Sequence, residues 1–265
     1  MPEPAPEHTA HAGEIADDLF RRESARLVAM LVGQFGTHRL QLAEDVVQES
    51  LVRALQLATH PATRQARTHA LLALMLLNAA RLPARTDDAG HLLRLHEQDR
   101  TAWNRGMIAR GLHYLALAST GDHLREYHLQ AGIAAGHCVA ADEALTDWPR
   151  ILEFYDHLAQ LNSSPVIALN RAVAVARVHG AQAGRDALQA TRVSLEHYYL
   201  YHAVQGRFAL ELGFVSEALA HFRKAESLAM LASEQEFLGR CIQDCVARLA
   251  APTGACNPSS LQGSR

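Results

Sequence analysis

The sequence predicts an all-α protein, and two observations carry this prediction. Ala and Leu account for 47 and 38 of the 265 residues, whereas Phe, Tyr and Trp together number 15. Ala and Leu lose little free energy on entering a helix, while strands favour β-branched and aromatic residues. Between residues 14 and 250 the chain has only four prolines, each near an expected helix boundary: Pro61, Pro83, Pro149 and Pro165. We therefore expect long helices across this span.

The chain divides into four segments. Residues 1–13 hold three prolines and residues 251–265 show no apolar periodicity, so we expect both ends to be disordered tails. Residues 14–60 have the pattern of a helical hairpin. Residues 61–250 have the pattern of a stack of helix pairs, in which each pair buries its apolar face against its neighbours.

Composition excludes several function classes. The formal charge of -3 argues against a generally basic nucleic-acid-binding protein. The longest apolar run has eight residues, far fewer than the ~20 that span a bilayer, so we expect no membrane contact. The single lysine, Lys224, follows Arg223 and not glycine, which excludes a P-loop. The four cysteines show no regular spacing, and a cytoplasmic location is the expected one.

The hairpin is predicted from its second helix, which begins near Leu42. Three acids, Glu44, Asp45 and Glu49, stand in its first two turns, where they suit the helix dipole. An apolar stripe follows the same helix at Val46, Val47, Leu51, Ala54 and Leu55. Without further information, this is an amphipathic hairpin with a solvated acidic end.

A helix-turn-helix is predicted for residues 202–228. Gly213 marks the turn, and Ser216 is the expected cap of the second helix. Small residues at 206, 218 and 225 with an aromatic residue at Phe222 resemble half of a tetratricopeptide (TPR) repeat. A weaker copy runs from Trp148 to Pro165. The alternative is an ordinary helical hairpin, and both readings predict stacked helix pairs.

Such a stack offers a groove to a protein partner of unknown identity. The candidates to line it are Tyr198, Tyr199, Tyr201 and Phe208, since exposed aromatic residues are enriched at interfaces. The alternative is that these aromatic residues are core, as we also expect for Trp103 and Trp148.

No enzyme, metal or cofactor site is predicted. The close histidine pairs are five residues apart, whereas two ligands on one helix face need a spacing of three or four. No HExxH, Gly-x-Ser-x-Gly or Gly-rich dinucleotide motif occurs. We therefore expect a non-enzymatic protein without cofactors.

Two stretches resemble a known family. LAEDVVQES, preceded by RRESARLVA and a Gly-containing turn, resembles the start of region 2 of an extracytoplasmic-function (ECF) RNA polymerase sigma factor. LLALMLLNAAR (71–81), EQDRTAW (97–103) and SPVIALNRAVAVA (164–176) resemble the TPR-like C-terminal extension of one ECF subfamily. The two resemblances occur in the family's own order.

This resemblance implies a partner and a site. In sigma factors the second region 2 helix binds the clamp helices of core RNA polymerase, and Asp45, Gln48 and Glu49 match the family's D-x-x-Q-E pattern, with Glu44 and Arg53 nearby. Their spacing places two carboxylates and an amide on one helix face. The resemblance thus implies polymerase binding through these five residues.

The family's DNA-reading middle is missing. The remainder of region 2 and the helix-turn-helix of region 4 have no counterpart, and residues 36–102 contain no Phe, Tyr or Trp with which to stack a base. We therefore expect no promoter recognition by this chain alone. The candidates for residual phosphate contact are Arg64, Arg67, Arg81, Arg85 and Arg94, although scattered arginines are more often solvated or paired with acids.

The expected function is therefore that of a sigma-factor-like transcription protein. It would bind core RNA polymerase through residues 44–53 and a regulatory partner through its helical part. The alternative is a TPR-type interaction adaptor without polymerase binding, in which the N-terminal hairpin only caps the stack.

Overall fold

The structure is a computed structural model that describes residues 40–60, 65–85, 87, 93–95, 97–119, 125–189 and 192–250. For residues 40–49 and 192–193 it describes the backbone alone. The two predicted tails, the first helix of the predicted hairpin and Arg64 lie outside the described residues.

Within this part of the chain every regular element is a helix, which confirms the all-α prediction. The first half contains α2 (Leu40–Thr59), α3 (Ala66–Ala79), α4 (Arg105–Ala118) and α5 (Glu126–Val139), with two 3-10 turns, η2 (Leu82–Ala84) and η3 (Arg100–Ala102). The second half contains α6 (Trp148–Leu161), α7 (Pro165–His179), α8 (Ala181–Leu188), α9 (Arg192–Leu195), α10 (Tyr199–Glu211), α11 (Val215–Leu228) and α12 (Ala232–Ala250).

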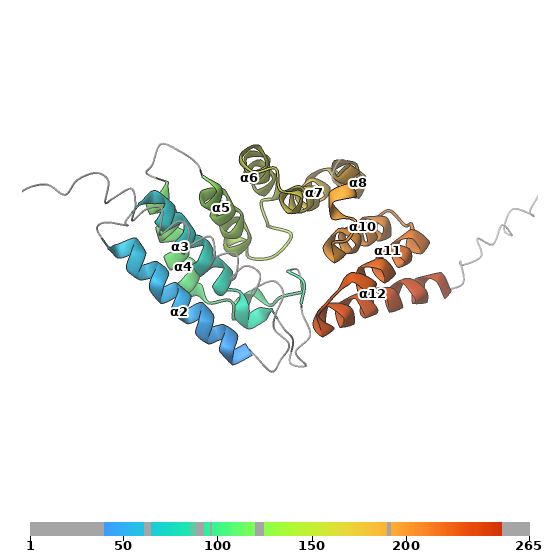
Figure 1. The fold of residues 1–265 in the computed structure, drawn as a ribbon, viewed down its shortest axis with the longest axis horizontal. Helices are drawn as coiled ribbons and strands as arrows, with labels where there is room; N and C mark the ends of the chain where they lie inside the picture. Colours follow the sequence, from blue (N-terminus) through green and yellow to red (C-terminus); the bar gives the residue numbers. More distant parts are fainter. Residues whose placement is uncertain are drawn as a thin grey trace, which may run out of the picture.

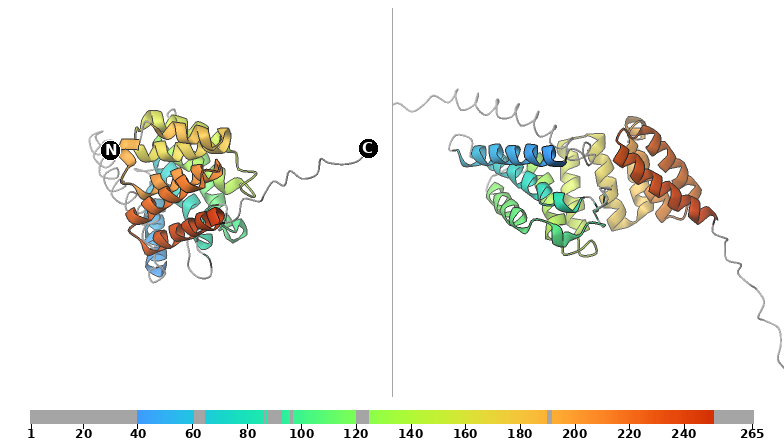
Figure 2. Two further views of the ribbon diagram at one scale, coloured as in Figure 1. Left: turned by 90° about the vertical axis from the view of Figure 1, so that its right-hand side faces the viewer. Right: turned by 90° about the horizontal axis from the view of Figure 1, so that it is seen from below.

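The helices form a curved array in which neighbours along the chain pack together (Figure 1). α2 lies at one end of the array and α12 at the other, as the right-hand view in Figure 2 also shows. α3 contacts α2, α4 and α5, and from α5 onward the long helices pack on their neighbours along the chain. Such an arrangement divides the core into successive clusters instead of one central core.

The predicted helix-turn-helix is present as α10 and α11. Gly213 adopts φ +83°, a left-handed conformation that ends α10. A Cβ atom at Gly206 would lie 2.9 Å from the Phe222 ring, so the absence of a side chain there lets the two helices approach closely. Ala218, Phe222 and Ala225 are buried between the helices, as their spacing predicted.

One detail of this pair differs from the prediction. The residue that precedes α11 is Phe214, and Ser216 lies inside the first turn of the helix. The turn after Gly213 is so short that the helix begins before Ser216 is reached. Three of the four interior prolines do mark helix starts, since Pro83, Pro149 and Pro165 each stand in a first turn.

None of the described helices combines the length and the apolar composition that crossing a bilayer requires.

Candidate functional site

The polymerase-binding residues predicted from the sequence lie in α2. Glu44, Asp45, Gln48 and Glu49 fall in its first half, where the backbone is helical. Positions 45, 49 and 53 are each four residues apart, so they follow one side of the helix backbone. Arg53, the last of them, is exposed.

The opposite side of α2 is fixed to the array. Ala54 and Ala58 are buried against Leu72 and Leu76 of α3. The side chain of His69 in α3 adds a hydrogen bond of 3.2 Å between its Nε2 and the carbonyl oxygen of Ala58. α2 is therefore held by its C-terminal half, while Val52, 52% exposed, lies outside the packed face.

The predicted aromatic groove is wrong for two of its four residues. Tyr201 is 5% and Phe208 is 3% exposed, and both belong to a core cluster with Leu169, Ala172 and Leu188. They face the interior because α10 packs on α7 and α8. The burial of Tyr201 and Phe208 agrees with the alternative prediction, in which these aromatic residues belong to the core.

Tyr198 and Tyr199 are half-buried at the start of α10. Burial raises the pKa of both hydroxyls, and a hydrogen bond with Glu234 of α12 raises that of Tyr199 further. Tyr199 thus ties α10 to α12 instead of standing free for a partner. Their role in partner binding stays a prediction.

The candidate phosphate-binding arginines do not form one compact patch. Arg67 and Arg81 stand near opposite ends of α3, which places them about 20 Å apart at ~1.5 Å per residue. The guanidinium of Arg67 lies over the Tyr127 ring, and Arg94 forms an ion pair of 2.5 Å with Glu97. Arg81 and Arg85 are half-buried, and burial lowers the pKa of both. These contacts fit the alternative in which the arginines serve the protein itself.

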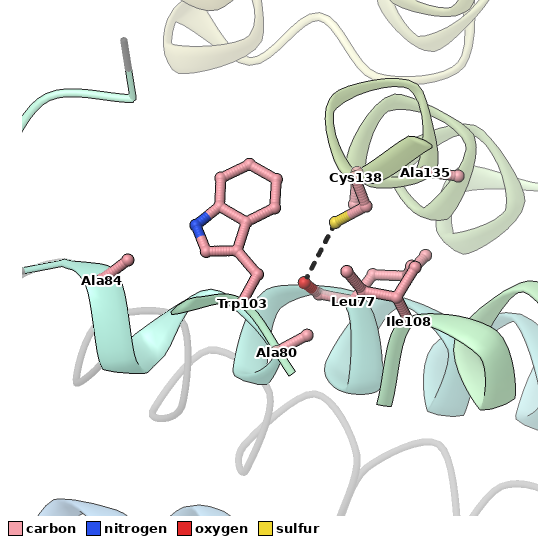
Figure 3. Close-up of a cluster of buried hydrophobic side chains, with 8 residues drawn as sticks. Leu77, Ala80, Ala84, Trp103, Ile108, Ala135 and Cys138 are labelled. Atoms are coloured by element: carbon pink, nitrogen blue, oxygen red, sulfur yellow. Dashed lines mark hydrogen bonds between the residues drawn. The ribbon is translucent and has the colours of Figure 1, made fainter. Parts of the chain in front are cut away.

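Trp103 is the centre of a cluster that joins α3, η2, η3 and α5. Its side chain is 2% exposed and packs against Leu77, Ala84 and Cys138. Figure 3 shows its indole nitrogen pointing toward the side of Ala84 and away from Cys138, whose thiol donates to the Leu77 carbonyl at 3.5 Å. The prediction that Trp103 is a packing anchor is confirmed.

Two guanidinium groups flank the indole. The Cζ atom of Arg81 lies 5.4 Å from the ring centroid and that of Arg100 lies 5.0 Å from it. Arg100 is fully engaged, because it donates to the carbonyls of His137 at 3.0 Å and Ala140 at 2.8 Å at the C-terminal end of α5. It therefore caps α5, whose last carbonyls have no partner within the helix.

Burial and these charges together set the pKa values of two neighbouring side chains. Burial, followed by the charges of Arg81 and Arg100, lowers the pKa of His137 to about 3, so this imidazole is neutral at pH 7. Burial raises the pKa of the Cys138 thiol to about 11, although the same arginines oppose the shift. Cys138 is therefore a packed thiol and not a nucleophile.

Sequence reasoning missed this cluster. In the sequence, Arg100 has no signal beyond its place in the segment EQDRTAW, and the pattern around Arg81 indicates a phosphate contact instead. Arg81, Arg100, Trp103 and His137 are separated by up to 56 positions in the chain. Only the packing of α5 on α3 brings them together.

Among the described residues, no three His, Cys, Asp or Glu side chains come together in a way that could hold a metal ion. Cys241 and Cys245 share a face of α12, and burial raises the pKa of each thiol.

The comparisons with known proteins give no activity. Residues 15–119 match the Family of unknown function (DUF6596). An "Uncharacterized protein R00370" of Rhizobium meliloti (strain 1021) is 38% identical over 168 residues, which cover 63% of this chain. The same alignment covers 40% of that protein, so this chain spans less than half of its relative's length. No solved structure matches.

Proposed function

We propose that this chain is a sigma-factor-like transcription protein that binds core RNA polymerase through α2. The observation that carries the proposal is the course of the α2 backbone, on which positions 45, 49 and 53 follow one side while Ala54 and Ala58 hold the other side on α3. A helix anchored in this way presents charged groups at fixed positions, as a docking element requires.

The pattern D-x-x-Q-E supports the proposal because of its chemistry. Two carboxylates and an amide one turn apart can accept hydrogen bonds from arginines or lysines on a partner. Arg53 adds a donor at the end of the same row. Because positions 45 and 49 lie on the side of the α2 backbone away from Ala54 and Ala58, their substitution should affect binding without unfolding the chain.

The test is charge reversal on α2. Asp45→Arg with Glu49→Arg should abolish co-purification with core RNA polymerase, because like charges would then face the basic partner. The matched control is Glu153→Arg with Asp186→Arg, which changes the net charge equally at two exposed positions on α6 and α8. The control should co-purify as the original chain does. Unchanged co-purification of the α2 variant would refute the proposal.

The alternative function, an interaction adaptor without polymerase binding, is favoured by one observation. Ala54 and Ala58 pack on Leu72 and Leu76 in the manner of any neighbouring pair of the array, so α2 is also the outer helix at one end of the described array. The adaptor predicts that a pull-down from the native lysate captures a protein partner but no polymerase subunits. The sigma-like proposal predicts that polymerase subunits are captured.

A further inference from the structure

One side chain of the segment between η2 and η3 contacts the last helix of the array. The Cζ atom of Arg94 lies 5.8 Å from the ring centroid of Phe237 in α12. The hydrogen bond to Glu97 is the largest cause that raises the pKa of the Arg94 guanidinium, and Cys241 and Asp244 of α12 raise it further. Positions 237, 241 and 244 are four and three residues apart, so they share one side of α12. Arg94 therefore lies along one face of that helix.

The backbone that carries Arg94 is fixed to the first half of the chain. The Leu93 N–H donates to the Arg85 carbonyl at 2.9 Å. On the other side of Arg94, Leu95 packs against the Trp103 cluster. The position of Arg94 is thus tied to α3, η2 and α5, while its side chain extends to α12.

Glu97 orders the Arg94 side chain. Its Oε1 atom accepts a hydrogen bond from the guanidinium at 2.5 Å, and its Oε2 atom accepts one from the Arg94 backbone N–H at 2.7 Å. A side chain that one acceptor already orders loses less conformational entropy when it contacts a second group. Arg94 is therefore prepared for its contact with α12.

The contact itself is small. The Arg94 side chain is 37% exposed, and among the described helices α11 alone packs extensively on α12. A cation–π contact of an exposed side chain shifts an equilibrium by about two- to fivefold. A contact of this size can form and break while the protein stays folded.

Both charged groups keep a partner when the contact is broken. Arg94 retains its ion pair with Glu97, and Asp244 has an ion pair of 3.0 Å with Arg248 in α12. Separation of Arg94 from α12 therefore leaves neither charge without an opposite charge, which keeps the cost of separation low.

The position of this contact gives it influence over the shape of the molecule. In a stacked array each helix contacts mainly its neighbours, and small rotations between neighbours add up along the stack. Arg94 connects the first half directly to α12, across all the helices from α6 to α11. It therefore restrains the sum of these rotations at a single point.

We propose that Arg94 is a reversible latch, which holds the curved array closed when its side chain lies on the face of α12 formed by Phe237, Cys241 and Asp244. In the open form this face is exposed, and the first half moves away from α12 while each helix keeps its packed neighbours. The proposal concerns the shape of the array, so it is independent of polymerase binding by α2.

Small-angle X-ray scattering of the full chain tests the latch. Arg94→Gln removes the cation and should raise the radius of gyration, because the open form becomes more populated. The matched control is Arg150→Gln. Arg150 also pairs with a glutamate three residues later, Glu153 at 2.6 Å, but it lies over Phe154 of its own helix. The control should leave the radius unchanged.

A second variant changes the other side of the contact. Phe237→Leu removes the ring and keeps an apolar side chain, and it should also raise the radius of gyration. Arg94→Gln with Phe237→Leu should raise the radius no further than the larger single effect, because both substitutions break the same contact.

Salt provides a measurement on the original chain. Higher ionic strength screens the attraction between Arg94 and Asp244, so the radius should rise with added sodium chloride. The rise should be smaller in Arg94→Gln, in which only other pairs between helices, such as Arg171 with Asp156, still respond.

Three results would overturn the proposal. The first is an unchanged radius in Arg94→Gln, and the second is an equal increase in Arg150→Gln. The third is strict additivity of Arg94→Gln and Phe237→Leu, which would show that the two residues act on separate contacts.

Discussion

At the scale of single residues, His137 shows how the Trp103 cluster makes stability depend on pH. Its imidazole is packed beside Trp148, with ring centroids 5.2 Å apart, and is surrounded by the positive charges of Arg81 and Arg100. Protonation would add a third positive charge to this place. The folded protein therefore holds His137 neutral.

This arrangement predicts a loss of stability in mild acid. The pKa of His137 falls from 6.5 to about 3 on folding, so between these values the unfolded chain binds more protons than the folded one. The free energy of unfolding should fall as the pH is lowered from about 6.5, with a slope of up to ~1.4 kcal/mol per pH unit from this group. Denaturant unfolding at several pH values in phosphate-free buffer measures the slope.

Two variants test whether His137 causes this pH dependence. His137→Gln should flatten the pH dependence below pH 6.5, whereas His157→Gln, at an exposed position on α6, reports the effect of removing a surface histidine. An equal slope in His137→Gln and the original chain would show that other groups cause the acid sensitivity.

Single residues also show which features of the structure a sequence pattern can predict and which it cannot. The burial of Phe222 follows from its position in a repeating apolar stripe. Tyr201 and Phe208 carry no such sign, because an aromatic side chain on a helix suits a core as well as a groove. The capping role of Arg100 could not be predicted from the sequence, since its acceptors are carbonyls about 40 residues away at the end of α5.

At the scale of helix pairs, close approach depends on residues without side chains. Gly206 in α10 faces the ring of Phe222 in α11, and a Cβ atom there would lie 2.9 Å from it. Gly184 in α8 has the same relation to Ala176, at 2.7 Å. The pairs therefore pack more closely than any larger residue would allow.

A glycine substitution tests this packing. Gly206→Ala should destabilise the protein by about 1–3 kcal/mol, because the added methyl group forces the Phe222 ring out of its place. Denaturant unfolding gives the difference in free energy.

Gly239 is the matched control for this substitution. It also lies within a helix, α12, but a Cβ atom there would have its nearest neighbour at 3.6 Å, an ordinary contact. Gly239→Ala should therefore leave stability unchanged or raise it by up to ~1 kcal/mol through helix propensity. Equal effects of the two substitutions would show that α10 and α11 are not in tight contact.

The element boundaries were predicted well where backbone chemistry fixes them. Gly213 and three prolines mark ends and starts that the structure confirms. The prediction that Ser216 caps α11 is wrong, because the short turn at Gly213, with its positive φ angle, lets the helix begin two residues earlier than predicted. Local propensity cannot resolve such a difference.

At the scale of the whole molecule, the curved array brings distant parts of the chain together. Arg94, in the segment between η2 and η3, lies over the ring of Phe237 in α12 at 5.8 Å. The first half of the chain thus contacts the last helix directly. The stack of helix pairs could be predicted from the sequence, but this contact could not, since the curvature accumulates from small rotations between pairs.

The proposed sigma-factor-like function predicts a negative outcome for promoter-directed transcription. Residues 36–102 contain no aromatic side chain with which to capture a flipped base. In a run-off assay with core polymerase and a promoter library from the native host, this chain alone should yield no specific transcripts. Specific transcripts would mean that another part of the chain reads DNA.

The proposal that α2 binds core RNA polymerase is tested most directly by titrating purified core RNA polymerase with the full chain. Fluorescence anisotropy of a chain labelled within residues 251–265, far from α2 in sequence, reports binding. We expect saturable one-to-one binding that Asp45→Arg with Glu49→Arg weakens at least a hundredfold and that Glu153→Arg with Asp186→Arg leaves unchanged. No saturable binding by the original chain, or equal binding by both variants, would contradict the account.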